Sequence, residues 1–210
     1  MNKIKKLVLL SLVAGSTSGA FASMENTWTG VYGGVNASVI ETTVSNANRN
    51  GYSFTNAAFG IETGANYGFD SGLILGMGVQ ANWSPFTNTS NNQAEGFYMT
   101  NQTTFFGAIL GNAGFAVNQN FAILANAGIG YLKADTTGQT AANFSDHSYG
   151  FVMPVVGADI MYKADNGIYG KIGFNYYIPT TQNYHSTVAN ADAPLTKGLF
   201  QSSLTMGYYF

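Results

Sequence analysis

The last twelve residues of the chain, 199–210, alternate between apolar and polar side chains and end on an aromatic residue. In an extended strand, one face would carry Phe200, Leu204, Met206, Tyr208 and Phe210. The opposite face would carry Gln201, Ser203, Thr205 and Gly207. Because side chains alternate across a β-strand, this pattern predicts a strand whose two faces meet different solvents.

The first residues carry the three parts of an export signal. A basic start with Lys3, Lys5 and Lys6 precedes a short apolar run at 7–14, and Ala20-Phe21-Ala22 follows as a cleavage site. The apolar run is too short for a membrane-spanning helix, which needs ~20 residues. We therefore predict a signal peptide at residues 1–22 and a single mature domain at 23–210, rather than a buried N-terminal helix.

The composition of the mature chain excludes several classes of protein. Without the leader it keeps five basic and ten acidic residues, so it lacks the basic patch that nucleic-acid binding requires. Charged residues are only 9% of the chain, against about a quarter in soluble domains, yet no mature segment has 18 consecutive apolar residues. A membrane barrel needs little surface charge because much of its outside faces lipid.

Eight alternating segments follow one another along the chain. They span residues 29–39, 59–69, 73–83, 99–115, 121–131, 149–162, 168–178 and 199–210. Four connections, 42–56, 84–97, 133–148 and 180–197, are long and polar, and the three between them are short turns. Short turns at one end and long loops at the other are typical of outer-membrane barrels, whose long loops lie outside the cell.

These segments predict an all-β fold, an eight-stranded antiparallel up-and-down transmembrane β-barrel. An open sheet edge in lipid would leave backbone groups unsatisfied, so the sheet must close on itself. The alternative is a soluble eight-stranded barrel with an apolar interior, which would need a more charged exterior than this chain offers. We therefore expect the protein in the cell outer membrane of a Gram-negative bacterium.

Several stretches resemble the small outer-membrane β-barrel family that includes the OmpA membrane domain and the opacity-type proteins. The stretches are Trp28-Thr29-Gly30-Val31-Tyr32-Gly33-Gly34, residues 114–130, residues 154–159 with 168–177, and the aromatic C-terminus. The resemblance covers the whole mature chain. It implies that Phe210 is the signal read by the barrel-assembly machinery, and that the loops serve adhesion or immune exposure.

Polar and charged residues with an inward phase form a candidate interior site. The resemblance implies an interior charge network, with Asp159 and Glu62 as possible partners of Lys171 and with Asn112 and Asn126 at other network positions. The main expectation is a Lys171–Asp159 pair, because both residues should face inward on neighbouring strands. A gating pair and a structural plug are both compatible with this set. We favour the plug because small barrels have interiors filled by side chains. Bulky inward residues would add to it, namely Tyr32, Phe106, Leu110, Met153, Tyr169 and Tyr177.

Aromatic residues near the strand ends form a second candidate set. We interpret them as the aromatic girdles of a membrane barrel rather than as a ligand-stacking surface. The set comprises Trp28, Trp83, Tyr67, Tyr131, Tyr162, Tyr176, Tyr208 and Phe210.

Enzymatic chemistry finds little support in the sequence. The only histidines, His147 and His185, fall in expected loops, and neither has a nucleophile and an orienting acid placed around it. We expect no catalytic residue, cofactor or metal. The expected function is a structural, surface-exposed barrel whose loops contact host molecules. A narrow channel for ions or small solutes and a lipid A-modifying enzyme are the alternatives. Expected partners are outer-membrane lipid, lipopolysaccharide and the assembly machinery, with the barrel itself a monomer.

Overall fold

The computed structural model describes residues 27–46, 49–85, 88–92, 97–140, 143–186 and 191–210, so the predicted signal at 1–22 lies outside the described residues. The described strands are β1 Gly30–Asn46, β2 Arg49–Gly68, β3 Leu73–Trp83, β4 Asn88–Asn92, β5 Phe97–Ala116, β6 Phe121–Thr140, β7 Asn143–Lys163, β8 Ile168–Ser186 and β9 Ala191–Tyr209. Within these ranges, no helix is long and apolar enough to cross a membrane.

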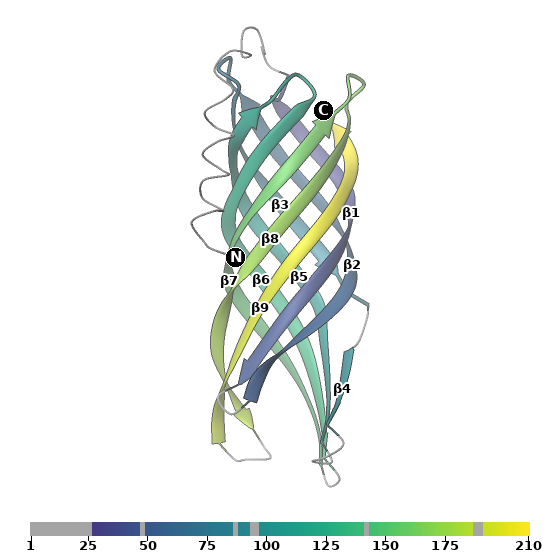
Figure 1. Cartoon of the computed structure of the whole chain (residues 1–210), viewed down its shortest axis with the longest axis vertical. Helices are drawn as coiled ribbons and strands as arrows, with labels where there is room; N and C mark the ends of the chain where they lie inside the picture. The colour runs from purple at the N-terminus through teal and green to yellow at the C-terminus, as the bar shows by residue number, and fades with distance from the viewer. Residues whose placement is uncertain (1–26, 47–48, 86–87, 93–96, 141–142, 187–190) are drawn as a thin grey trace.

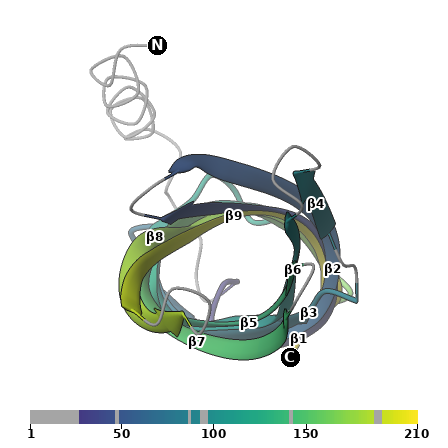
Figure 2. The same cartoon turned by 90° about the horizontal axis from the view of Figure 1, so that it is seen from below.

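The strands close into a ring. Each pairs antiparallel with its neighbours in the order β3-β2-β1-β9-β8-β7-β6-β5, and an additional β3–β5 pairing closes the circle (Figures 1 and 2). The short strand β4 pairs with β5 at Asn88 and Asn101, just beyond the rung that joins Trp83 to Phe105. It therefore continues the wall begun by β3. The predicted eight-stranded antiparallel barrel is confirmed.

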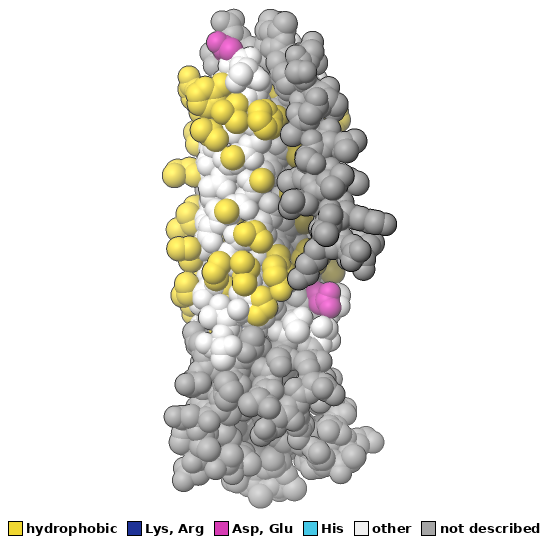
Figure 3. Space-filling model, turned by 60° about the vertical axis from the view of Figure 1, so that its left-hand side comes forward, with side chains coloured by type: hydrophobic (Ala, Val, Ile, Leu, Met, Phe, Trp, Pro, Cys, Tyr) yellow, Lys and Arg dark blue, Asp and Glu magenta, His cyan; other side chains and the backbone are white. Residues whose placement is uncertain are grey.

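The barrel is apolar on its outside. Met77, Ile109 and Met206 each expose 66–67% of their surface, and residues of the opposite phase are buried inside. Figure 3 shows apolar side chains spread over the face of the cylinder that it presents, with acidic side chains above and below them. Such an inverted arrangement suits a wall that faces hydrocarbon.

Short turns join the strands at the end of the barrel that also holds the C-terminus, at the top in Figure 1. Gly72 and Gly167 take φ of 81° and 86°, which favours glycine, and their N–H groups donate to Phe69 O and Ala164 O. In the third turn, the Asn118 side chain accepts from the N–H groups of Asn120 and Phe121, each at 2.8 Å. Residues within the three short turns therefore determine the conformation of the chain at this end of the barrel.

Three of the four connections that we expected to be loops are largely strand and the fourth, 84–97, is strand in part, so that prediction was wrong in extent. The β6–β7 ladder continues to the pair Thr140–Asn143, β8–β9 to Ser186–Ala191, and β1–β2 to Asn46–Arg49. Strand β4 lies inside the stretch 84–97. In these outward stretches polar residues occupy both alternating positions of the sequence, so the apolar alternation fades while backbone pairing persists.

Toward the outward end, from the edge of the apolar band onward, the ring divides into two four-stranded sheets. Sheet A comprises residues 40–46, 49–58, 179–186 and 191–199; sheet B comprises 88–92, 97–104, 133–140 and 143–154. Between the strands as described, β7–β8 pairing ends at Val155 and Tyr177, and β2–β3 pairing at Phe59 and Trp83. Figure 1 shows the two groups diverging at its lower end. We call the interruption between β7 and β8 the β7/β8 seam.

Candidate functional site

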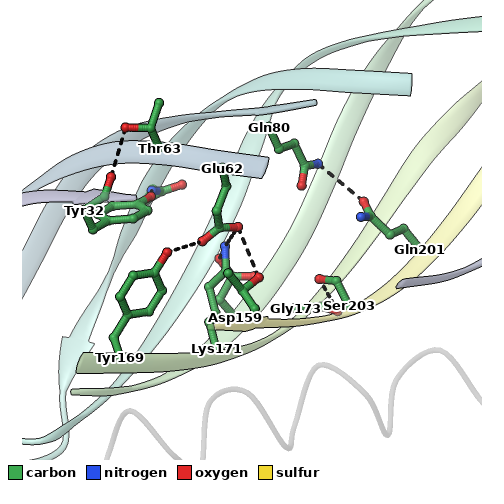
Figure 4. Close-up of polar contacts among 12 residues, drawn as sticks. Tyr32, Glu62, Thr63, Gln80, Asp159, Tyr169, Lys171, Gly173, Gln201 and Ser203 are labelled. Atoms are coloured by element: carbon green, nitrogen blue, oxygen red, sulfur yellow. Dashed lines mark hydrogen bonds and ion pairs between the residues drawn. The ribbon is translucent and has the colours of Figure 1, made fainter. Parts of the chain in front are cut away.

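A charged cluster occupies the middle of the lumen. Lys171 Nζ of β8 lies 2.7 Å from Glu62 Oε2 of β2 and 3.4 Å from Asp159 Oδ2 of β7 (Figure 4). All three residues are at least nine-tenths buried. They come together because each occupies a strand position whose side chain points into the barrel. Glu62, which the sequence offered as an alternative partner, is the closer of the two carboxylates. A buried charge without a partner would be costly, and here Lys171 and the two carboxylates compensate one another's charge.

Hydroxyl and amide groups extend this cluster into a polar layer. Tyr169 OH and Thr205 Oγ1 donate to the two oxygens of Glu62, at 3.1 and 3.4 Å. A second set of hydrogen bonds in this layer does not include the charged cluster: Gln80 Nε2 donates to Tyr177 OH at 3.0 Å and to Gln201 Oε1 at 3.4 Å. The Gln80 network was not predicted from the sequence. Its only signal there is the inward phase of Gln80 and Gln201.

The two predicted asparagines also lie inside the barrel. Asn112 is 7% exposed, and its Nδ2 donates to Tyr32 OH at 3.4 Å. Asn126 is 4% exposed, and both atoms of its amide lack a hydrogen-bond partner among the described residues. A cavity of about 10 Å³ beside Tyr32, Asn112 and the charged cluster has room for about one water molecule. Side chains therefore fill most of the space beside the charged cluster.

Apolar layers lie on both sides of the polar layer. Toward the outward end, the buried cluster includes Ile40, Phe106, Leu132, Phe151, Met153 and Leu199. Toward the short turns, it includes Trp28, Ile74, Leu124, Met161 and Tyr209. The rings of Phe106 and Tyr177 meet edge to face at 5.9 Å. The six residues expected to fill the lumen, including Tyr32 and Leu110, are all buried.

Trp28 is not a girdle residue, and that prediction was wrong. Its side chain is 2% exposed and lies in the turn-side apolar layer, where its Nε1 donates to Asn118 O at 3.4 Å. Tyr209 OH donates to Trp28 O at 2.6 Å, and Lys163 Nζ lies 5.4 Å from the centre of the indole ring. Trp28 precedes the first strand, so strand alternation does not govern its direction, and its ring fills the end of the lumen.

The other seven girdle candidates all face outward. Their exposed fractions range from 44% for Tyr131 and Tyr176 to 77% for Phe210. Trp83, Tyr67, Tyr162 and Tyr208 fall within this range. Phe210 is held in place by its N–H, which donates to Val31 O at 2.7 Å. Their contact with the membrane interface stays a prediction, as does recognition of Phe210 by the assembly machinery.

The two histidines lie on strands rather than in loops. In the backbone register, His147 of β7 pairs with Thr136, and His185 of β8 pairs with Asp192. Both side chains lie outside the part of the chain whose side chains are described. Among the described residues, no group of three or more His, Cys, Asp and Glu side chains could hold a metal ion.

Comparison with known proteins decides the family. The family model described as "Outer membrane protein beta-barrel domain" matches residues 7–205. The chain belongs to this family. It is accordingly an outer-membrane protein of a Gram-negative bacterium. No curated protein matches its sequence.

Among solved structures, the barrel is similar to Ail, the attachment invasion locus protein of Yersinia pestis, with 12% identity, a TM-score of 0.48, and coverage of 87% of this chain and 99% of Ail. It is also similar to Neisserial surface protein A, with 12% identity, a TM-score of 0.43, and coverage of 85% and 97%. The outer membrane protease OmpT of Escherichia coli has 9% identity, a TM-score of 0.42, and coverage of 90% and 100%.

Proposed function

We propose that this protein is a non-enzymatic surface barrel whose two outward sheets contact molecules outside the cell. One observation carries the proposal: the strands continue far beyond the apolar band, while the lumen beneath them is filled. Strand β7 extends from Val155 outward to Asn143, roughly 40 Å of extended chain at ~3.4 Å per residue. A cell gains little from such a projection unless its surface meets something.

The chemistry of the outward strands supports this role. Residues 97–104 and 133–140, which pair in sheet B, contain many Asn, Gln and Thr residues and only two charged ones, Lys133 and Asp135. Neutral polar side chains offer hydrogen-bond donors and acceptors without a strong field. We propose that host-surface molecules bind there through hydrogen bonds rather than through bulk charge attraction.

A channel function is disfavoured by the same lumen. Two apolar layers enclose the Lys171 cluster, and the cavity beside the cluster holds about one water molecule. We expect the purified barrel in planar lipid bilayers to give no steady single-channel conductance, and Lys171→Ala to leave it silent. Steady conductance of the native barrel that changes in Lys171→Ala would favour the channel instead.

Replacement of the outward hairpins tests the surface role. We would replace residues 42–56, 84–97, 133–148 and 180–197, one at a time, by short turns and measure binding of cells to a panel of host cells and matrix proteins. At least one replacement should abolish binding while the purified barrel still resists denaturation by detergent. Unchanged binding in all four variants would contradict the proposal.

The remaining roles concern assembly. We propose that residues 1–22 direct export, that Phe210 is recognised by the barrel-assembly machinery, and that the protein is a monomer in contact with outer-membrane lipid and lipopolysaccharide. Phe210 suits recognition because the residue is 77% exposed. Phe210→Ala should lower the amount of folded barrel in the outer membrane while leaving refolding in vitro unchanged. Equal amounts in cells would contradict the assembly role.

A further inference from the structure

We propose that the mouth of the barrel at the short-turn end binds the headgroup of a zwitterionic phospholipid, with the phosphate on Lys163 and the ammonium on Asp165. The site lies at the opposite end of β7 and β8 from the β7/β8 seam, at the top of the barrel in Figure 1. This inference rests on the proposed contact with outer-membrane lipid and deepens it, because it names the class of lipid and the residues that bind it.

A pocket of about 610 Å³ opens at this mouth. Ligand pockets commonly measure about 300–1,000 Å³, so this one has room for a small headgroup. Its lining combines the segment before β1, the β5–β6 turn, the β7–β8 turn and the end of β9, and includes Thr29, Asn120, Lys163, Asp165 and Tyr208. Four parts of the chain that are far apart in the sequence therefore build one site.

Lys163 supplies a cation to this pocket. Its side chain is half-buried, and Nζ lies 4.7 Å from the centre of the Tyr209 ring and 5.4 Å from that of Trp28. Nζ donates to Thr27 O, but no carboxylate of a described residue lies within ion-pair distance of it. An ammonium group has three donors, so two remain for a ligand. A partly desolvated cation with free donors in an open pocket favours an anion.

Asp165 supplies the opposite charge, and Asn120 holds it beside Lys163. Asn120 Nδ2 donates to Lys163 O at 2.8 Å and to Asp165 Oδ1 at 3.2 Å. The Lys163 N–H donates to Asn120 O at 2.8 Å. The exposed carboxylate of Asp165 acts electrostatically on Lys163 without forming an ion pair with it. The pocket thus presents two separate charges of opposite sign, which suits a ligand that carries both.

The rim of the pocket continues into the lipid-facing surface. Tyr208 and Phe210 line the pocket and are also 45% and 77% exposed on the outside of the barrel. Their rings meet edge to face at 5.0 Å. Ile168, which pairs with Tyr208, is 48% exposed on the apolar wall. Because aromatic rings suit the boundary between headgroups and acyl chains, a ligand in the pocket can place its chains on this wall.

These features together identify the class of ligand. A simple anion would be repelled by Asp165, and a simple cation by Lys163. A soluble zwitterion would leave the aromatic rim and the apolar wall without a contact. A phospholipid with a primary ammonium group supplies a phosphate for Lys163, N–H donors for Asp165 and acyl chains for the wall.

The chain itself offers one competing occupant. Glu25 precedes Thr27 by two residues in the sequence and lies outside the described residues. Its carboxylate would supply an anion to Lys163, but Glu25 has neither an ammonium group for Asp165 nor an acyl chain. A test that varies these two groups of the ligand therefore separates the two occupants.

The test uses the full mature protein with Trp83→Phe, which leaves Trp28 as the single tryptophan. Because Lys163 lies beside the indole ring, the emission of Trp28 reports on the pocket. The protein in non-ionic detergent micelles is titrated with dioleoyl phosphatidylethanolamine, with dioleoyl phosphatidylmethanol, which lacks the ammonium, and with glycerophosphoethanolamine, which lacks the acyl chains.

Phosphatidylethanolamine should give a saturable shift of the Trp28 emission. Phosphatidylmethanol should bind about threefold more weakly, because an exposed ion pair such as that with Asp165 contributes modestly. Glycerophosphoethanolamine should bind at least about tenfold more weakly, because it cannot contact the apolar wall. The last comparison distinguishes a membrane lipid from a free phosphate ester.

Two substitutions in the pocket should affect different parts of the ligand. Lys163→Met should weaken the binding of both lipids about tenfold or more, because the phosphate loses its cation. Asp165→Asn keeps an oxygen for Asn120 but should abolish the preference for phosphatidylethanolamine. Asp70→Asn changes an exposed carboxylate of the β2–β3 turn, outside the pocket lining, and should retain both affinity and preference. Unchanged amide protection at residues 155–163 shows that each variant still folds.

Three results would overturn the inference: no saturable shift of the Trp28 emission with phosphatidylethanolamine, equal affinity for the two lipids, or native affinity in Lys163→Met. The proposed functions fail separately. If lipid binds the native protein and Lys163→Met alike, general contact with lipid stands and the headgroup site is wrong. The host-surface role is tested by the hairpin replacements, which leave this pocket unchanged.

Discussion

The membrane-spanning cylinder and the two outward sheets are built from the same strands but differ in closure. Within the apolar band every strand has two partners, and the ring is complete. Beyond it, pairing among the described residues is interrupted between β7 and β8 and between β2 and β3. Hydrocarbon cannot satisfy a free backbone edge, whereas water can. We infer that closure of this sheet is required by the surrounding hydrocarbon, and not by the strands themselves.

The two regions also differ in the surroundings of their buried lysines. Lys171, within the band, has two carboxylates within 3.4 Å. Lys197, three residues beyond the exposed Phe200 and within sheet A, is fully buried, and its Nζ lies 5.8 Å from the centre of the Phe151 ring. Burial lowers the pKa of Lys197 to about 8, against the opposing effect of Asp135. Substitutions in the two regions should therefore differ in the size and the pH dependence of their effects.

The largest effect is expected inside the membrane. Lys171→Met would leave Glu62 and Asp159 buried together without a cation. Removing one partner of a buried ion pair costs about 3–5 kcal/mol. Urea unfolding of the barrel in lipid vesicles should show a loss of this size. A control variant with Lys171→Met, Glu62→Gln and Asp159→Asn should recover most of it. Native stability of the single variant would show that the cluster is not a structural plug.

The two tryptophans should differ almost as strongly. Trp28→Ala would empty the turn-side end of the lumen, which costs about 3 kcal/mol or more for a buried aromatic side chain. Trp83 is 49% exposed on the outside, so Trp83→Ala should cost clearly less. The same unfolding assay ranks the pair. Equal losses would mean that Trp28 serves as an interface anchor, as its sequence position first indicated.

The buried lysine of sheet A should make stability depend on pH. The folded-state pKa of Lys197 lies below the unfolded value of about 10.4, so the unfolded chain binds more protons between these values. The free energy of unfolding should therefore rise between about pH 8 and pH 10, by up to about 1.4 kcal/mol per pH unit. Lys197→Met should remove this rise. A variant with the native pH slope would contradict the burial of the charged group.

The smallest effect concerns a link between the two sheets. Thr42 Oγ1 of β1 and Thr103 Oγ1 of β5 lie 3.2 Å apart across the lumen, and both residues are buried. Thr103→Val should cost about 1 kcal/mol and should speed amide exchange in residues 97–104. Thr43→Val changes an exposed residue on the same strand as Thr42 and should have little effect. If the two variants behave alike, this hydrogen bond does not join the sheets.

Sequence alone predicted the cylinder well because lipid and lumen impose opposite demands on alternate residues. That contrast is visible in the alternation itself, which correctly places Met77 outward and Lys171 inward. The contrast fades in the outward stretches, where polar residues occupy both alternating positions of the sequence. The extents of β6 and β7 toward Thr140 and Asn143 were therefore missed, and so was β4.

The lumen was predictable as a set of residues but not as a set of contacts. Inward phase identified Glu62 and Asp159, yet it could not say that Glu62 would lie nearer to Lys171. That preference depends on the shear of the barrel, which sets which strands face each other across the lumen. The Gln80–Gln201 contact arises from the same long-range geometry. Trp28 lies outside any strand, so strand alternation could not predict the direction of its side chain.

Residue-resolved amide exchange of the protein in lipid nanodiscs tests the central contrast most directly. Along β7, we predict strong protection throughout residues 155–163, where both sides of the strand are paired. We predict alternate fast and slow amides in residues 143–154, where only the side facing β6 is paired. Uniform slow exchange along the whole of β7 would show a ring closed to its outward end and would contradict this contrast between the two regions.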